Sequence, residues 1–267
     1  MLVLIRGAGD LASGIALRLY RSGMRIVMTD IAQPTAIRRT VAFSEAIRLG
    51  RCAVEDIEAR RADGAGQALS LLAEGIIPVL ADPACGCREA LCPDALVDAI
   101  LAKRNLGTRI TDAPVVVGVG PGFTAGEDCH AVVETMRGHT LGRVIYRGSA
   151  LPNTNIPGLI GGFAGERVLR APADGTFTAV RRIGDTVASG DTVGLVSGEP
   201  MRCTIGGVLR GLLADGVEVR RGMKAGDVDP RGDADFCHTS SDKALAVGGG
   251  VLEALLHFTG AMTDYGK

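Results

Sequence analysis

The chain has 267 residues, of which 46% are hydrophobic and 22% are charged, and its formal net charge is −1. This composition is typical of a folded protein with one large or two modest domains. The near-neutral charge and the 3% aromatic content, with no tryptophan, argue against nucleic-acid binding. No apolar run approaches 18 residues and no export signal is evident, so we expect no membrane association and a cytoplasmic location.

The first predicted element is an apolar strand at residues 2–5, which leads through a glycine-rich turn into a helix over 11–22. Gly7, Gly9 and Ala12 form the pattern G-x-G-x-x-A, and Asp10 stands at the start of the helix. In this pattern the first glycine makes a tight turn, the second lets a backbone amide approach a pyrophosphate, and the small third residue packs helix on strand. The pattern predicts a nucleotide or dinucleotide ligand, and a purely structural turn is the alternative.

A second apolar strand at residues 26–28 is followed by Asp30, which lies 21 residues beyond Gly9 (30 − 9). An acidic residue at about this spacing binds a ribose 2′-hydroxyl in dinucleotide sites. We therefore expect Asp30 to face the ribose and to disfavour a 2′-phosphate. NAD should then bind better than NADP.

Strands and helices continue to alternate further along the chain. The patterns predict helices at 43–49, 65–74 and 93–103 and strands at 76–80, 115–119, 131–133 and 143–146. This order predicts a Rossmann-like, mostly parallel sheet in a nucleotide-binding domain over residues 1–165, with ligands outside the carboxyl ends of the strands. Gly120 and Gly122, in a second glycine-rich loop, are expected at the same edge. The predicted cofactor-binding residues are therefore Gly7, Gly9, Asp10, Ala12, Asp30, Gly120 and Gly122.

Groups that could carry chemistry are few. Lys103 and His139 are candidates for a general acid or base, although no compact catalytic set accompanies them. The seven cysteines fit reduced thiols, and Cys85, Cys87 and Cys92 lack the paired C-x2-C spacing of a zinc site. We expect no metal, and a metal or redox role of this cluster is the less favoured interpretation.

An internal repeat begins near residue 166. Residues 183–190 realign on 215–222 with a shift of 32 (216 − 184), and the segment 199–203 lies between the halves. With the opening Ala171-Pro-Ala-Asp-Gly175, residues 166–230 resemble a biotinyl or lipoyl carrier domain, which implies a small all-β barrel-sandwich hybrid. Arg202 stands where that family has its modified lysine, so we expect no biotin or lipoate. The C-terminal segment 231–267 is expected to contain a helix over 244–258 that packs back on the first domain.

Glycine-rich signatures along nearly the whole chain resemble one family, the YqeB-like accessory proteins of selenium-dependent molybdenum hydroxylases. The matching segments are Arg6 to Gly14, Ala102 to Thr108, Gly120 to Gly126, Glu134 to Gly142, Pro152 to Gly158, Gly206 to Gly211, Lys224 to Arg231 and Ser241 to Lys243. The resemblance implies a role in maturing such a hydroxylase. It transfers no catalytic residue, and the cysteine cluster is not part of it.

Three hypotheses follow. In the first, the chain is an accessory protein whose partners are the molybdenum hydroxylase apoenzyme and a nucleotide-type ligand, such as a molybdopterin dinucleotide held by the first loop. In the second, it is an NAD-dependent oxidoreductase that uses the same loop. In the third, it is a docking scaffold without chemistry. Whether a reaction is catalysed and whether the chain forms a homo-oligomer are left open by the sequence.

Overall fold

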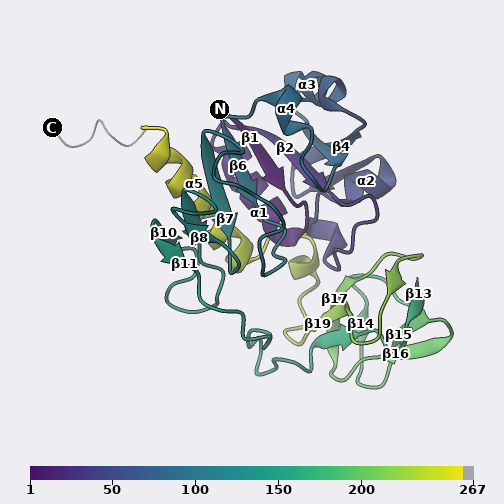
Figure 1. Cartoon of the computed structure of the whole chain (residues 1–267). Helices are drawn as coiled ribbons and strands as arrows, with labels where there is room; N and C mark the ends of the chain where they lie inside the picture. The colour runs from purple at the N-terminus through teal and green to yellow at the C-terminus, as the bar shows by residue number, and fades with distance from the viewer. Residues whose placement is uncertain (261–267) are drawn as a thin grey trace. The chain divides into compact units, whose positions relative to one another are not determined.

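A computed structural model describes residues 1–260 of the chain, which divide into two units (Figure 1). Of the described residues, the first unit comprises 1–34, 43–153 and 240–260. The second unit comprises residues 35–42 and 154–239.

The first unit is built on a nine-stranded sheet with the order β10-β9-β7-β6-β1-β2-β5-β4-β3. All neighbours from β9 to β4 pair in parallel, whereas the edge strands β3 and β10 pair antiparallel. The strands are β1 (Leu2–Arg6), β2 (Arg25–Asp30), β3 (Arg51–Val54), β4 (Ile57–Ala62), β5 (Ile77–Ala81), β6 (Ala95–Asp98), β7 (Val115–Val119), β9 (Ala131–Val133) and β10 (Val144–Ile145). A separate two-stranded sheet joins β8 (Thr124–Ala125) and β11 (Gly148–Ser149).

The parallel strands form because their apolar runs can be buried on both faces of the sheet. Residues 2–5 of β1 and all of β7 are buried. The parallel pairing brings the ends of β4, β5, β2, β1, β6, β7 and β9 to one edge, which we call the carboxyl edge. The first loop therefore lies on an edge shared by six other strand ends.

Helices α1 (Asp10–Arg21) and α5 (Asp242–Phe258) of the first unit pack closely against each other. Figure 1 shows α5 alongside the sheet. A Cβ atom at Gly14 of α1 would meet the Ala244 Cβ of α5 at 2.5 Å, and one at Gly248 would meet the Gly14 carbonyl oxygen at 3.0 Å. The Ser241 side chain caps α5 by accepting a hydrogen bond from the Ala244 N–H. The helices are α1 (Asp10–Arg21), α2 (Glu45–Leu49), α3 (Ala65–Ala73), α4 (Arg88–Leu91) and α5 (Asp242–Phe258).

One local expectation is corrected by these elements, and one hairpin was missed. Residues 93–103, predicted as a helix, instead form the short strand β6 and a loop in which Leu101 and Lys103 have positive φ. The reason is that a short apolar run buried on both faces cannot be distinguished from a buried helix by periodicity. The hairpin of β3 and β4 was not predicted.

The second unit contains two four-stranded sheets whose paired strands are antiparallel, ordered β16-β15-β13-β18 and β12-β19-β17-β14. A shift of 32 residues carries β12, β13, β14 and β15 onto β16, β17, β18 and β19, so the two orders are the same under the repeat. The bounds are β12 (Val168–Arg170), β13 (Gly175–Ala179), β14 (Thr186–Val187), β15 (Thr192–Val196), β16 (Glu199–Arg202), β17 (Gly207–Leu212), β18 (Glu218–Val219) and β19 (Lys224–Asp229). Two short 3-10 helices, η1 (Arg39–Val41) and η2 (Ala234–Cys237), also belong to this unit.

The predicted fold class, a Rossmann-like domain followed by a barrel-sandwich hybrid, is wrong. The strand beside β2 is β5, although β4 is the next parallel strand along the chain. In addition, β6, β7 and β9 follow one another without intervening helices. The fold is a mixed α/β arrangement with one large, mostly parallel sheet and separate antiparallel sheets. The strand order could not be predicted, because it depends on which distant segments pair and local sequence patterns do not determine that pairing.

Candidate functional site

The first loop leaves the N-terminus of α1 open. Gly9 is the N-cap residue, with extended backbone (φ −69°, ψ −177°), and no side chain caps the helix. A Cβ atom at Gly9 would meet nothing within 4 Å. The first-turn N–H groups of a helix have no intrahelical partner and lie at the positive end of its dipole. An anionic group can therefore approach the backbone at Gly9.

The rest of the loop is held in place by backbone hydrogen bonds. Gly7 has φ +104°, and a Cβ atom there would lie 2.9 Å from the carbonyl carbon and oxygen of Ala99. Its N–H donates to the Thr29 carbonyl at 2.7 Å, and the Ala8 carbonyl accepts from the Ser44 N–H at 2.9 Å. Ala12 is buried in the first turn of α1. The loop is thus fixed before any ligand binds.

Asp30, the last residue of β2, contacts this loop directly. Its Oδ2 accepts from the Ala8 N–H at 2.9 Å and its Oδ1 from the Ile31 N–H at 2.8 Å. Burial raises the pKa of the Asp30 carboxyl, outweighing the two N–H groups that lower it. Each carboxylate oxygen can accept more than one hydrogen bond, so Asp30 can still accept one from a ribose hydroxyl.

Arg6, at the end of β1, is engaged in the protein itself. Its guanidinium contacts Asp98 at 3.3 Å and donates to Thr108 Oγ1 at 2.9 Å and to the carbonyl oxygens of Pro83 and Leu106. Asp98, at the end of β6, is 2% exposed and also accepts from the Thr108 hydroxyl at 2.6 Å. This network fixes the loop after β6 to the carboxyl edge.

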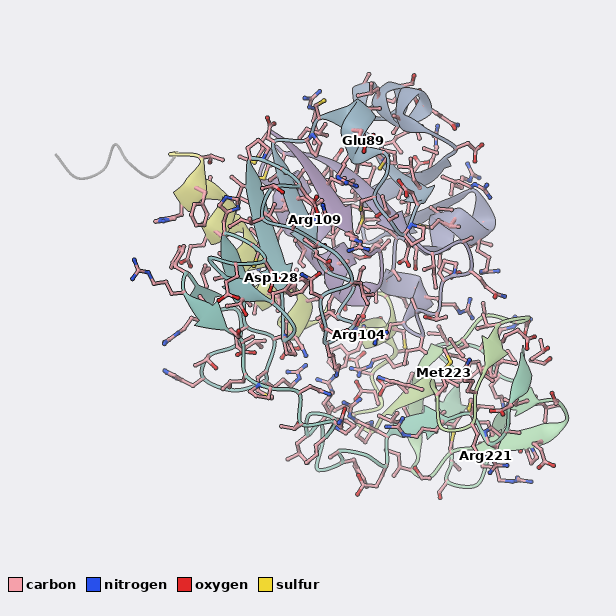
Figure 2. All side chains as sticks on the ribbon, in the orientation of Figure 1. Glu89, Arg104, Arg109, Asp128, Arg221 and Met223 are labelled. Carbon is pink, nitrogen blue, oxygen red and sulfur yellow. The ribbon has the colours of Figure 1, made fainter. Side chains whose placement is uncertain are left out.

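The glycines of the second loop serve internal packing. Gly120 and Gly122 both have positive φ, and a Cβ atom at Gly122 would lie 2.6 Å from the backbone N and Cα of Arg104. A Cβ atom at Gly120 would lie 2.8 Å from Thr135 Oγ1. Figure 2 labels Arg104 in the loop that Gly122 contacts. Binding of a ligand by these two glycines stays a prediction.

The two acid–base candidates are not joined by a hydrogen bond in residues 1–260. Lys103 is exposed, and its Nζ donates to Asn153 Oδ1 at 2.7 Å. His139 is an exposed residue of the loop between β9 and β10. The structure therefore adds no observation in favour of the oxidoreductase hypothesis.

The cysteine cluster lies beside Asp82, just past the end of β5. The Cys87 N–H donates to Asp82 Oδ2 at 2.8 Å, and the Cys85 Sγ is 3.1 Å from Thr29 Oγ1. Burial raises the pKa of Cys85 to about 11 and that of Cys87 to about 12, the latter with a further contribution from Asp82. No group of three or more potential metal ligands occurs in the part of the chain that the structure describes.

A feature that sequence reasoning missed is a cavity of about 340 Å³ at the ends of β4 and β5. Its lining is formed by Arg61, Ala62, Asp63, Gly64, Ala65, Leu80, Ala81, Asp82 and Cys87. The signal available in the sequence was an aspartate directly after each of these two strands, Asp63 after β4 and Asp82 after β5. Asp63 was overlooked because the strand before it was not predicted.

Comparison with known proteins gives one strong similarity. The chain is 52% identical over 256 residues to the uncharacterized protein YqeB of Escherichia coli (strain K12), covering 96% of this chain and 47% of YqeB. The chain thus spans about half the length of the curated relative that it matches. The similarity supports a YqeB-like relationship along nearly the whole chain. No protein-family model matches it.

Among solved structures, the chain is similar to two proteins of the aspartoacylase group. A succinylglutamate desuccinylase/aspartoacylase from Rhodobacter sphaeroides is 17% identical, with 53% of this chain and 60% of that one covered and a TM-score of 0.24. An aspartoacylase family protein from Mesorhizobium loti is 11% identical, with coverages of 85% and 84% and a TM-score of 0.28. Within residues 1–260, no helix has the length and apolar character needed to cross a membrane.

Proposed function

We propose that the first unit binds a pyrophosphate-containing nucleotide through the loop between β1 and α1. The observation that carries the proposal is the uncapped N-terminus of α1 at Gly9, open on its Cβ side and next to the Asp30 carboxylate. The helix N-terminus supplies N–H donors for the phosphates, and the carboxylate supplies an acceptor for a ribose hydroxyl. Both groups are held in place by the loop's own hydrogen bonds.

We infer further that the nucleotide is a molybdopterin dinucleotide and that the chain assists maturation of a selenium-dependent molybdenum hydroxylase. Support comes from the signatures that resemble the YqeB-like accessory family. Several of them build the carboxyl edge, since residues 102–108 hold Arg6 and Asp98 and residues 120–126 pack on Arg104. Another begins at Glu134, a buried carboxylate that accepts from the N–H groups of Thr135, Met136 and Leu151. The hydroxylase apoenzyme would be the partner.

A thermal-shift panel tests the proposal with NAD, NADP, ADP-ribose, CTP and molybdopterin cytosine dinucleotide. A ligand at 100 times its Kd stabilises a protein by about 2.7 kcal/mol, which is a measurable rise in Tm. We expect the molybdopterin dinucleotide to give the largest rise, and NAD to exceed NADP because the 2′-phosphate would lie beside Asp30. If no member of the panel raised the Tm, the proposal would be wrong. If NADP matched NAD, Asp30 would not face the ribose.

A further inference from the structure

The cavity at the ends of β4 and β5 lies next to the proposed nucleotide site. β5 is the neighbour of β2, and Asp30 pairs with Ala81 while Thr29 pairs with Leu80. Leu80 and Ala81 both line the cavity. Because neighbouring strands are about 4.8 Å apart, the cavity begins one strand spacing from Asp30. A ribose bound at Asp30 can direct its attached group into this space.

The charges of the lining favour a neutral group over a phosphate. Arg61 Nε donates to Asp63 Oδ1 at 3.0 Å, so the guanidinium is already paired with a carboxylate. Asp82 supplies a second carboxylate, which leaves two negative groups against one positive group around the cavity. The remaining lining includes the apolar residues Ala62, Ala65 and Leu80, which suit the face of a planar ring.

Asp82 offers a specific hydrogen-bond acceptor. Burial would raise the pKa of its carboxyl, but the backbone N–H groups of Cys87 and Gly86 outweigh this effect, and the pKa is lowered. The group is therefore charged at neutral pH. Its Oδ2 accepts from the Cys87 N–H at 2.8 Å, and the carboxylate has further capacity to accept from a ligand.

We infer that this cavity is a nucleobase subsite and that Asp82 selects a base with an exocyclic amino group, such as cytosine or adenine. The inference rests on the proposed function, because it needs the pyrophosphate at the first loop and the ribose at Asp30. The amino group of cytosine donates to a carboxylate, whereas the corresponding carbonyl of uracil would be repelled by it. Asp82 is thus a specificity-determining residue.

Titration calorimetry with CDP, UDP and inorganic pyrophosphate tests this subsite. For the wild-type chain we expect CDP to bind at least tenfold more tightly than UDP, and Asp82→Asn should remove most of this preference. Ala81→Phe places a ring in the cavity from an exposed lining position and should weaken CDP binding at least tenfold. Binding of inorganic pyrophosphate, which has no base, should change less than twofold. Ala73→Phe, at an exposed position of α3 that does not line the cavity, is the matched control.

The outcomes separate this inference from the proposed function. Equal binding of CDP and UDP by wild-type protein would show that the inferred base subsite is wrong. CDP binding by folded Ala81→Phe as tight as that of wild type would show the same. In either case the proposal that the first loop binds a nucleotide would be unaffected. If wild-type protein bound neither the nucleotides nor pyrophosphate, the proposed function itself would be overturned. Asp82→Asn keeps the test decisive should Ala81→Phe fail to fold.

Discussion

At the scale of single residues, Gly7 and Gly9 have different reasons to be glycine. Gly7 is required by the protein itself, because its positive φ and the Ala99 backbone leave no room for a Cβ atom. Gly9 has an ordinary extended conformation and open surroundings, so the fold does not demand glycine there. The spacing from Gly9 to Asp30 predicted that Asp30 would lie near this loop. It could not predict that Asp30 accepts from Ala8, because that contact depends on how β1 and β2 are paired.

The buried thiols lead to a prediction about pH. The pKa values of Cys85, Cys129 and Cys203 are raised to about 11, chiefly by burial, whereas an unfolded thiol titrates near pH 8.5. The folded protein holds these protons more tightly, so their contribution to stability is complete below about pH 8.5 and is lost as the pH rises towards 11.

We therefore expect the free energy of unfolding to fall steadily between pH 9 and pH 11. Denaturant unfolding at a series of pH values measures it. Mass spectrometry after brief iodoacetamide treatment at pH 8 should find label first on the exposed Cys92. Equal labelling of Cys85 and Cys92 in folded protein would contradict the burial argument.

At the scale of elements, the packing of α5 explains two of its three consecutive glycines, Gly248 and Gly250, which are costly in a helix. Gly250 is buried, and a Cβ atom there would overlap the carbonyl oxygen of Gly142. Gly249, one position earlier, is exposed and would gain a Cβ atom in open space. Sequence patterns predicted the helix at 244–258 well because it is long and capped by Ser241. They failed at β6, which is too short to show a period.

These two adjacent glycines should respond oppositely to alanine. Gly249→Ala should raise the free energy of unfolding by up to about 1 kcal/mol, since glycine is the poorer helix former. Gly250→Ala should lower it by about 1–3 kcal/mol, since the added methyl group overpacks a tight contact. Urea denaturation of both variants measures the difference. A stabilised Gly250→Ala protein would show that α5 does not pack on residue 142 in this way.

At the scale of the whole molecule, each unit is organised by one feature. In the first unit, parallel strands bring the first loop, Asp30 and the cavity to one edge of a single sheet. In the second unit, two sheets repeat the same strand order after 32 residues. The repeat was visible in the sequence because its two halves share the same local turn motifs. The order of the nine strands was not, because it arises from contacts between distant segments.

The central claim is that Gly9 opens α1 to a phosphate-bearing ligand. Its most direct test is calorimetric titration of ADP-ribose into wild-type protein, Gly9→Val and the control Gly165→Val, whose position is also open. All three proteins should unfold cooperatively at similar temperatures, because valine is compatible with the backbone at residue 9. We predict that wild type and Gly165→Val bind with the same Kd and that Gly9→Val binds at least a hundredfold more weakly. Undiminished binding by folded Gly9→Val would contradict the account.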